Sequence, residues 1–217
     1  LGRGDEVVLL QRGTSVVDTP QVRGDVRDTE AVHRAMHGCD AVVHAAAKVG
    51  IVGAWEDFRS INVDGTANVI GTARELGVSR VVYVSTPSVS HAGRSLIGAG
   101  ADPAVTGRAH AHYAESKAIA ERLALGAASD ALPLVAIRPH LVWGPGDTQL
   151  VGRIVERGRA GRLALVGGGT ALIDTTYLDN AASALVAALD AAVPGAACVG
   201  RAYVIANGEP RPIRELI

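Results

Sequence analysis

Lysine and cysteine are both scarce in this chain of 217 residues, and long apolar runs are missing from its sequence. No run approaches the roughly 20 residues that a membrane-spanning helix needs, so the sequence predicts no membrane span. The 21 basic and 22 acidic residues are interspersed and leave a formal net charge of -1. Because no basic stripe is present, we expect no nucleic-acid partner.

Cys39 and Cys198 are the only cysteines of the chain. Two thiols so far apart in sequence fit the reduced cysteines of a cytoplasmic protein better than a disulfide framework. Metal-binding patterns are also missing, because neither His44 nor His140 has a His, Asp or Glu partner at ligand spacing. We therefore predict a cytoplasmic protein with no metal site. A hydrophobic content of 48% is enough for one well-formed core.

One of the two lysines, Lys117, follows Tyr113 by four residues. The alanines and the leucine that come after them favour a helix, in which residues i and i+4 share a face. The spacing therefore predicts a phenol beside an ammonium group. A neighbouring cation lowers the pKa of a tyrosine from about 10 toward neutrality, as a general acid/base requires. The alternative is a surface lysine on an amphipathic helix.

Short aliphatic runs alternate with longer helical stretches, which is the pattern of βαβ units around a parallel sheet. The predicted strands cover residues 6–10, 21–24, 41–44, 80–85 and 134–137. The predicted helices cover residues 28–36, 61–76, 110–125, 150–159 and 179–189. Most of the strands are continuous apolar runs, as expected when both faces are buried. We predict an α/β fold with a doubly wound, Rossmann-like parallel sheet.

The same pattern predicts how the chain divides. Residues 1–145 would form a Rossmann-like domain, and residues 146–217 part of a small substrate-binding region interleaved with the last elements of the sheet. The chain begins at Leu1 and runs directly into its first strand. We therefore expect it to lack the strand and the glycine-rich turn that usually open such a fold. The later cluster of glycines at 167–169 is predicted to be a surface turn.

Six segments occur in an order that is known from one protein family. They are residues 24–28 (Gly-Asp-Val-Arg-Asp), 43–47 (Val-His-Ala-Ala-Ala), 61–66 (Ile-Asn-Val-Asp-Gly-Thr), 84–89 (Val-Ser-Thr-Pro-Ser-Val), 138–146 (Arg-Pro-His-Leu-Val-Trp-Gly-Pro-Gly) and 176–181 (Thr-Tyr-Leu-Asp-Asn-Ala). Tyr113 and Lys117 lie between the fourth and the fifth. With these motifs the chain resembles, along nearly its whole length, the extended short-chain dehydrogenase/reductase family. This family belongs to the NAD-dependent epimerase/dehydratase superfamily, and the nearest branch is 3β-hydroxysteroid dehydrogenase-like.

The resemblance implies a catalytic set made of Thr86, Tyr113, Lys117 and Asn62. Tyr113 would exchange the proton, Lys117 would lower the phenol pKa and hold the nicotinamide ribose, and Asn62 would support the lysine through water. Thr86 falls at the position of the family's serine and would bond the substrate oxygen. Ser88 is the second candidate for that hydroxyl and a candidate substrate contact. Capping of the strand end is the alternative role of Thr86.

The resemblance also implies an NAD(P) cofactor bound by residues 1–145. Besides Lys117, its expected contacts are Asp25, Val26, His44, Ala45, Ala46, Pro139, His140 and Leu141, with Trp143 toward the substrate. Gln11 and Arg12, at the end of the first predicted strand, bear on the choice of coenzyme. A carboxylate there would bind the ribose 2′-hydroxyl of NAD, whereas arginine can pair with the 2′-phosphate of NADP. We predict NADP, with NAD as the alternative, and an exposed turn arginine is the other interpretation of Arg12.

These implications together predict an oxidoreductase that transfers hydride between nicotinamide and a hydrophobic secondary alcohol or ketone, of the 3β-hydroxysteroid or 3-keto acid type. A nucleotide-sugar epimerase or dehydratase uses the same trio and is the first alternative. The second is an inactive truncated or cofactor-sensing relative that kept the fold and lost the chemistry. The family also suggests a homodimer formed through the long helices.

Overall fold

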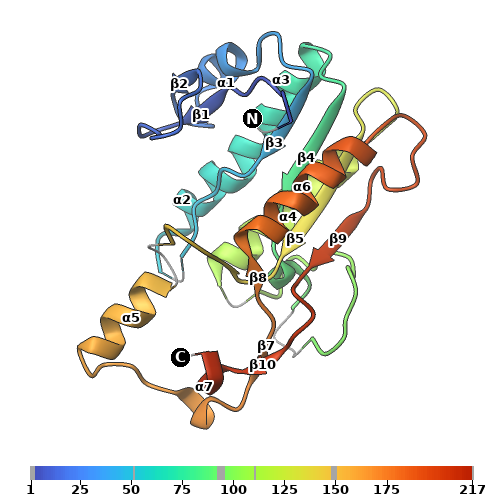
Figure 1. Cartoon of the computed structure of the whole chain (residues 1–217). Coiled ribbons are helices and arrows are strands. Elements are labelled where there is room, and N and C mark those ends of the chain that lie inside the picture. The colour runs from blue at the N-terminus through green and yellow to red at the C-terminus, as the bar shows by residue number, and fades with distance from the viewer. Residues whose placement is uncertain (1–2, 51, 92–95, 110, 148–150, 217) are drawn as a thin grey trace.

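Figure 1 shows the computed structural model of the chain, in which a central sheet is flanked by helices. The structure describes all residues except 1–2, 51, 92–95, 110, 148–150 and 217. Its main sheet has four parallel strands in the order β3-β4-β5-β9. Their bounds are Ala41–His44, Arg80–Val84, Leu134–Pro139 and Ala202–Ile205. All four strands therefore end at the same edge of the sheet, where α/β folds place their sites.

Helices cover both faces of this sheet (Figure 1). On one face, Val81 and Tyr83 of β4 belong to a core with side chains of three helices, α1 (Thr29–Met36), α3 (Gly65–Glu75) and α4 (His112–Ala127). On the other face, Val82 packs with Ala188 of α6 (Leu178–Ala191). Successive strand residues point to opposite faces, so each face needs its own layer of helices. The predicted doubly wound α/β fold is confirmed.

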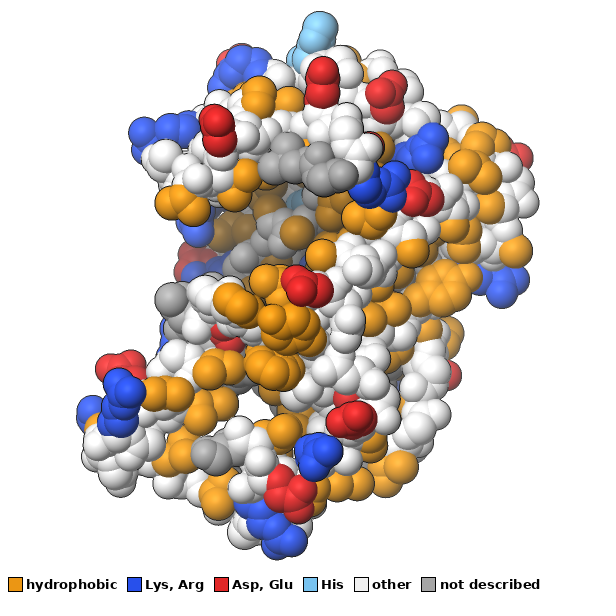
Figure 2. All heavy atoms as spheres, viewed as in Figure 1, with side chains coloured by type: hydrophobic (Ala, Val, Ile, Leu, Met, Phe, Trp, Pro, Cys, Tyr) orange, Lys and Arg blue, Asp and Glu red, His pale blue; other side chains and the backbone are white. Residues whose placement is uncertain are grey.

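A second, two-stranded parallel unit lies beside the main sheet. It consists of β1 (Leu9–Gln11) and β2 (Gln21–Arg23), and in the described part of the chain neither strand is hydrogen-bonded to β3. A cleft of about 660 Å³ separates β1 from β3 and is lined by residues of both strands. Figure 2 shows the surface hollowed beside these N-terminal elements. The cleft leads toward the carboxyl ends of the strands.

The remaining elements are short or lie after the sheet. They are α2 (Trp55–Phe58), the π-helix η1 (Arg59–Asp64), the 3₁₀ helices η2 (Pro87–Ser90) and η3 (Val166–Gly169), β6 (Val142–Trp143), α5 (Val151–Arg159), β7 (Leu172–Ile173), β8 (Thr176–Tyr177), β10 (Arg211–Pro212) and α7 (Ile213–Leu216). Parallel β6 and β8 form one pair, and antiparallel β7 and β10 form another. In Figure 1, α5, α7, β7 and β10 lie together below the main sheet.

The predicted elements match the structure best where the apolar pattern is strong. The strand predicted at 41–44 has the observed bounds, whereas the first strand begins at Leu9 rather than at residue 6. Before Leu9 the Val7 carbonyl accepts from the Thr19 hydroxyl instead of pairing in a ladder. The helix predicted over 61–76 is divided into η1 and α3. The predicted starts of two helices, at residues 110 and 150, lie outside the described residues.

Three further observations concern the sequence predictions. Strand β9 was not predicted. Its four residues form a strand by pairing with β5, which lies far away in the sequence. Glycines 167–169 belong to η3, and each of them has a positive φ. The cluster of glycines forms a turn, as the sequence predicted. In the described part of the chain, both cysteines are free and half-buried, and no helix is long and apolar enough to cross a membrane.

Two glycines of α3 provide a test of how tightly this fold is packed. A Cβ atom on Gly65 would lie 2.6 Å from Val26 Cγ2, whereas a Cβ on Gly71 would meet no atom within 4 Å. Gly65→Ala should lower the free energy of unfolding by about 1–3 kcal/mol through overpacking. Gly71→Ala should raise it by up to about 1 kcal/mol through helix propensity. Urea denaturation of both variants checks this, and equal effects of the two would contradict it.

Candidate active site

Helix α4 packs on the sheet face that contains Val81 and Tyr83, and it carries Lys117. The helix carries alanines at 118, 120 and 124 on its buried face, which lets its backbone approach the strands closely. Lys117 is only 3% exposed, and its Nζ donates to the Val84 carbonyl at 2.7 Å. The same Nζ lies 4.2 Å from the centroid of the Tyr83 ring, in cation–π geometry. The ammonium is thus fixed at the carboxyl end of β4 and is not a surface group.

Two hydroxyls follow directly after β4. Thr86 is the N-cap of η2, where its side chain accepts from the Ser88 backbone at 3.4 Å, and its Oγ1 lies 2.9 Å from Ser88 Oγ. Thr86 therefore has the capping role that was considered as its alternative. Its hydroxyl is also close enough to the Tyr113 side chain to lower the pKa of the phenol. The structure brings Tyr113, Thr86 and Ser88 together.

The electrostatics of this group differ from the sequence prediction. Burial raises the pKa of Tyr113, against the smaller opposing effect of the Thr86 hydrogen bond. Burial also lowers the pKa of Lys117 to about 7, and the Glu121 carboxylate opposes this shift. The prediction that Lys117 lowers the tyrosine pKa was wrong for the chain as it stands. The physical reason is desolvation, which disfavours the charged form of both side chains.

Asn62 joins two segments that are far apart in the sequence. It is 1% exposed and lies on η1, and π-helical turns of this kind are frequent at functional sites. Its Oδ1 accepts from the Lys48 backbone N–H at 2.7 Å, and its Nδ2 donates to the Lys48 carbonyl at 3.1 Å. Nδ2 also donates to Ser116 Oγ at 2.9 Å. Asn62 thus ties the segment after β3 to helix α4, next to Lys117.

The last residue of β3, His44, is buried and neutral. Its Nε2 lies 3.0 Å from Thr66 Oγ1, and the Thr66 hydroxyl donates to the Asn62 carbonyl at 2.6 Å. Because the single hydroxyl proton is used there, His44 Nε2 must be the donor, which leaves Nδ1 as an acceptor. Burial, assisted by Lys117, lowers the pKa of His44 to about 3.

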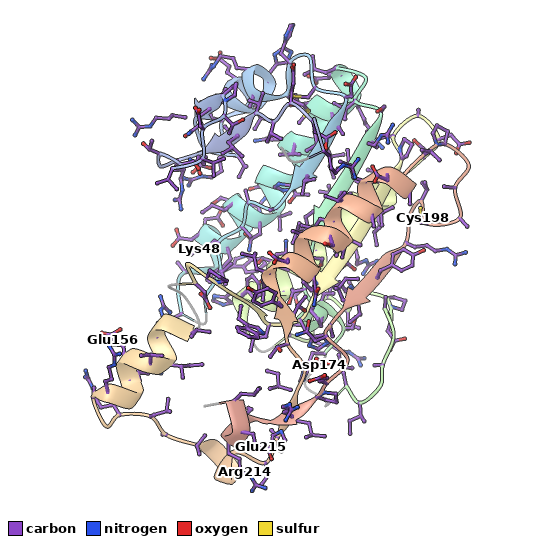
Figure 3. All side chains as sticks on the ribbon, in the orientation of Figure 1. Lys48, Glu156, Asp174, Cys198, Arg214 and Glu215 are labelled. Atoms are coloured by element: carbon purple, nitrogen blue, oxygen red, sulfur yellow. The ribbon has the colours of Figure 1, made fainter. Side chains whose placement is uncertain are left out.

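The cleft beside β1 collects the cofactor candidates from the first half of the chain. Its lining includes Gln11, Arg12, Asp25, Val26, His44, Ala45 and Ala46. Asp25 accepts from Arg27 at 2.9 Å through two nitrogens, and this pairing lowers its pKa. Lys48, labelled in Figure 3, lies on the segment after β3 and also lines the cleft. A single cavity thus contains seven residues that the sequence motifs associate with one ligand.

The later candidates lie around the end of β5 and are not among the described residues that line this cleft. Pro139 is the last residue of β5, and the His140 backbone donates to Ile205 of β9 at 2.8 Å. Burial lowers the pKa of His140, and Asp174 opposes this shift. Leu141 is 37% exposed.

Trp143 is 39% exposed, and its indole N–H donates to Thr175 Oγ1 at 3.2 Å. Its ring lies edge-on to Tyr177, with the two ring centroids 5.2 Å apart. Trp143 and Leu141 are therefore both accessible apolar residues beyond the end of β5.

Sequence reasoning missed one part of this region, the ion pair between Glu121 and Arg138. Both side chains are at most 1% exposed, and Arg138 Nη2 lies 2.5 Å from Glu121 Oε1. A signal was present, because Arg138 follows a strand of apolar residues and a buried arginine requires a partner. A second cleft, of about 690 Å³ along α5, contains none of the predicted site residues.

The neutral state of His44 predicts a pH dependence of stability. In the unfolded chain this histidine titrates near 6.5, whereas the folded-state pKa is lowered to about 3. As the pH falls below 6.5, the unfolded state therefore binds a proton that the folded state does not, and His44 should remove up to about 1.4 kcal/mol of stability per pH unit. The loss ends near the folded-state pKa.

Unfolding free energies measured between pH 7 and pH 4.5 check this prediction. His44→Gln keeps a donor for Thr66 and should flatten the dependence, whereas His33→Gln, on the exposed face of α1, should leave the slope as it is. Identical slopes in the wild type and in His44→Gln would show that His44 is not buried in its neutral form.

The sequence of this chain is similar to the sequences of known proteins. The 2-alkyl-3-oxoalkanoate reductase of Stenotrophomonas maltophilia (strain K279a) is 49% identical over 221 residues, which cover 99% of this chain and 67% of that protein. The 3-beta-hydroxysteroid dehydrogenase of Mycolicibacterium neoaurum is 32% identical, over 97% of this chain and 61% of that protein. This chain therefore spans about two thirds of the length of these curated relatives.

Solved structures show the same architecture. The UDP-glucose 4-epimerase of Thermus thermophilus, in complex with NAD, superposes with a TM-score of 0.78 at 26% identity, covering 99% of this chain and 74% of that one. The model of the 3-beta hydroxysteroid dehydrogenase/isomerase family matches residues 5–216. Since this match spans both the cleft and the Tyr113 site, the chain belongs to the 3-beta hydroxysteroid dehydrogenase/isomerase family.

Proposed function

We propose that the protein is an NAD(P)-dependent oxidoreductase acting on a hydrophobic secondary alcohol or ketone. The observation that carries this proposal is the meeting of Tyr113 with Thr86 and Ser88, with Lys117 fixed at the end of the same strand. A phenol beside a hydroxyl donor can hold a carbonyl oxygen and transfer a proton to it. The nicotinamide, when bound, supplies or accepts the hydride.

Each residue of the site has a defined part in this chemistry. The raised pKa of Tyr113 keeps it protonated at neutral pH, so its phenol is a proton donor to the oxygen of a ketone. Thr86 Oγ1 donates a hydrogen bond to the same oxygen, and Ser88 lies within reach as its partner. Lys117 holds the ribose side of the cofactor, and Asn62 keeps helix α4 in register with the segment after β3.

The cleft supports a dinucleotide as the cofactor. It is lined by residues of β1, of β3 and of the segment directly after β2, and its wall combines the charged residues Arg12, Asp25 and Lys48 with apolar ones such as Ala45 and Ala46. A ligand that has both phosphate groups and flat aromatic rings fits such a mixed lining. The exposed Arg12 favours a 2′-phosphate, and we therefore propose NADP, although the solved epimerase structure contains NAD.

An apolar surface near the site favours a hydrophobic substrate. Leu141, Val142 and Trp143 are each more than one third exposed just after β5. Apolar side chains gathered beside a polar trio are typical of pockets for water-insoluble ligands. The names of two relatives, a 2-alkyl-3-oxoalkanoate reductase and a 3-beta-hydroxysteroid dehydrogenase, also support a hydrophobic substrate. Between the two, the higher identity of the reductase favours a 3-keto acid over a steroid.

Removal of the phenol is the direct test of the chemistry. Tyr113→Phe should lower the rate of ketone-dependent NADPH oxidation at least about 100-fold, because no proton donor of suitable geometry remains. The dissociation constant for NADP⁺, measured by calorimetry, should change less than about threefold. Equal loss of turnover and binding would show that Tyr113 is structural, and unchanged turnover would show that Tyr113 is not the proton donor. Cofactor binding without any turnover in the wild type would favour the cofactor-sensing alternative.

A pair of arginines tests the choice of coenzyme. Arg12→Ala should reduce the preference for NADPH over NADH by about tenfold, which corresponds to one charge-assisted contact of about 1.4 kcal/mol. Arg23→Ala is the matched control, since Arg23 is also exposed but is not among the residues that line the cleft. Affinities for both coenzymes, measured on both variants, decide the result. An unchanged ratio in Arg12→Ala would remove the basis for NADP.

The substrate class is tested by two additions to the same assay. A long-chain 3-keto acid should oxidise NADPH, which is measured by the loss of absorbance. A nucleotide diphosphate sugar should be recovered unchanged by chromatography. Conversion of the sugar without net NADPH oxidation, and no reaction with the keto acid, would establish the epimerase or dehydratase alternative, which uses the same trio. Assembly as a homodimer stays a prediction of the family resemblance, and a cytoplasmic location stays a prediction from the two distant cysteines.

A further inference from the structure

Behind the site, three ionisable side chains are buried together. Lys117, Glu121 and Arg138 are 3%, 0% and 1% exposed. Glu121 is the only fully buried carboxylate in the described part of the chain, and it stands one helical turn after Lys117, on the same face of α4. Its carboxylate is held by Arg138 through Nε at 2.8 Å and Nη2 at 2.5 Å. This buried anion therefore forms an ion pair with Arg138 and also acts electrostatically on Lys117.

Stability alone does not explain this arrangement. Taking an ion pair out of water is costly, and apolar side chains of similar volume usually stabilise a core as well or better. Strand β5 is otherwise apolar from Leu134 to Ile137, so a further apolar residue at 138 would continue its pattern. The ion pair therefore points to a role beyond packing.

Arg138 also reaches the loop that carries the hydroxyls. Its Nη1 donates to Ser90 Oγ at 2.7 Å and to the Asp102 carbonyl at 2.8 Å. Ser90 is the last residue of η2, whose cap is Thr86. From β5, a single guanidinium thus contacts the helix of Tyr113, the turn of Thr86 and Ser88, and the segment that leads into that helix. Its planar fork suits such divergent contacts.

We propose that Glu121 and Arg138 are positioning residues for the reaction: Glu121 provides the negative charge that favours the ammonium form of Lys117, and Arg138 fixes η2 against helix α4. This inference rests on the proposed function for its catalytic meaning, but its electrostatic part does not. The groups that face Lys117 are His44 from β3, Tyr83 from β4 and Glu121 from its own helix. Of these, only Glu121 is an anion.

The scarcity of lysine makes this inference measurable. Lysines labelled with ¹³C at Cε give two resonances in this chain, and Lys48→Arg assigns them. In Glu121→Gln the titration midpoint of Lys117 should fall by about 1 pH unit, because the attraction of an adjacent opposite charge is lost. Glu115→Gln removes the same charge from the same helix and should leave the midpoint unchanged. A fall no larger than that of the control overturns the proposal.

A double variant separates positioning from packing. Glu121→Gln alone leaves the buried Arg138 charge without its partner and is expected to destabilise the fold. Glu121→Leu combined with Arg138→Met removes both charges and should recover a melting temperature near that of the wild type. If the pair only packs, the double variant also recovers the wild-type titration of Lys117 and the wild-type pH profile of kcat/KM. The proposal expects stability without recovery of either, because the anion is still missing.

The readouts also keep the two proposals apart. The Lys117 titration and the unfolding measurements need neither cofactor nor substrate, so they decide the role of Glu121 even if no oxidoreductase activity is found. Where activity is found, the limb of the pH profile that reports Lys117 should move with the resonance by the same amount. A profile that stays fixed while the resonance moves would limit Glu121 to electrostatics without catalytic consequence, against the proposal.

Discussion

The contact between the Lys117 ammonium and the Val84 carbonyl is the constraint on which the site depends. A cation that is 3% exposed needs compensation, and it receives this from the carbonyl at the end of β4, the Tyr83 ring and Glu121. If helix α4 slid or rotated on the sheet, the cation would lose the carbonyl and the ring, which both belong to β4. Tyr113, one turn earlier, is therefore held at Thr86 as a consequence of where Lys117 is buried.

The parallel sheet supplies the second requirement, because it gathers residues from distant parts of the chain at one edge. His44 ends β3, Val84 ends β4 and Pro139 ends β5. Behind this edge, the bonds of His44 to Thr66 and of Thr66 to the Asn62 carbonyl link the cleft wall to η1. Asn62 continues the connection to Ser116 of α4. The wall of the cleft and helix α4 thus belong to one hydrogen-bonded framework, which fixes their relative position.

The sequence allows prediction of those parts of the fold and site that depend on local order. The spacing of Tyr113 and Lys117 and the apolar runs at 41–44, 80–85 and 134–137 predict a helix and strands that the structure contains. Strand β9, the π-helical turn at Asn62 and the partner of Arg138 could not be predicted in the same way, because each is defined by groups far away in the sequence. The predicted shift in the pKa of Tyr113 was wrong for the same reason, since desolvation depends on how the layers of helices and strands pack together.

Desolvation has a consequence for the direction of the chemistry. It raises the pKa of Tyr113 and lowers that of Lys117, so the lowered phenol pKa expected from the spacing is not found. A neutral phenol with its proton in place is instead suited to donate to a ketone oxygen, which is the reductive direction. The reverse reaction needs the phenolate, and its formation is easier the more firmly Lys117 holds its own proton. Under the proposed roles of these residues, the buried carboxylate of Glu121 would set how readily the site works in the direction of oxidation.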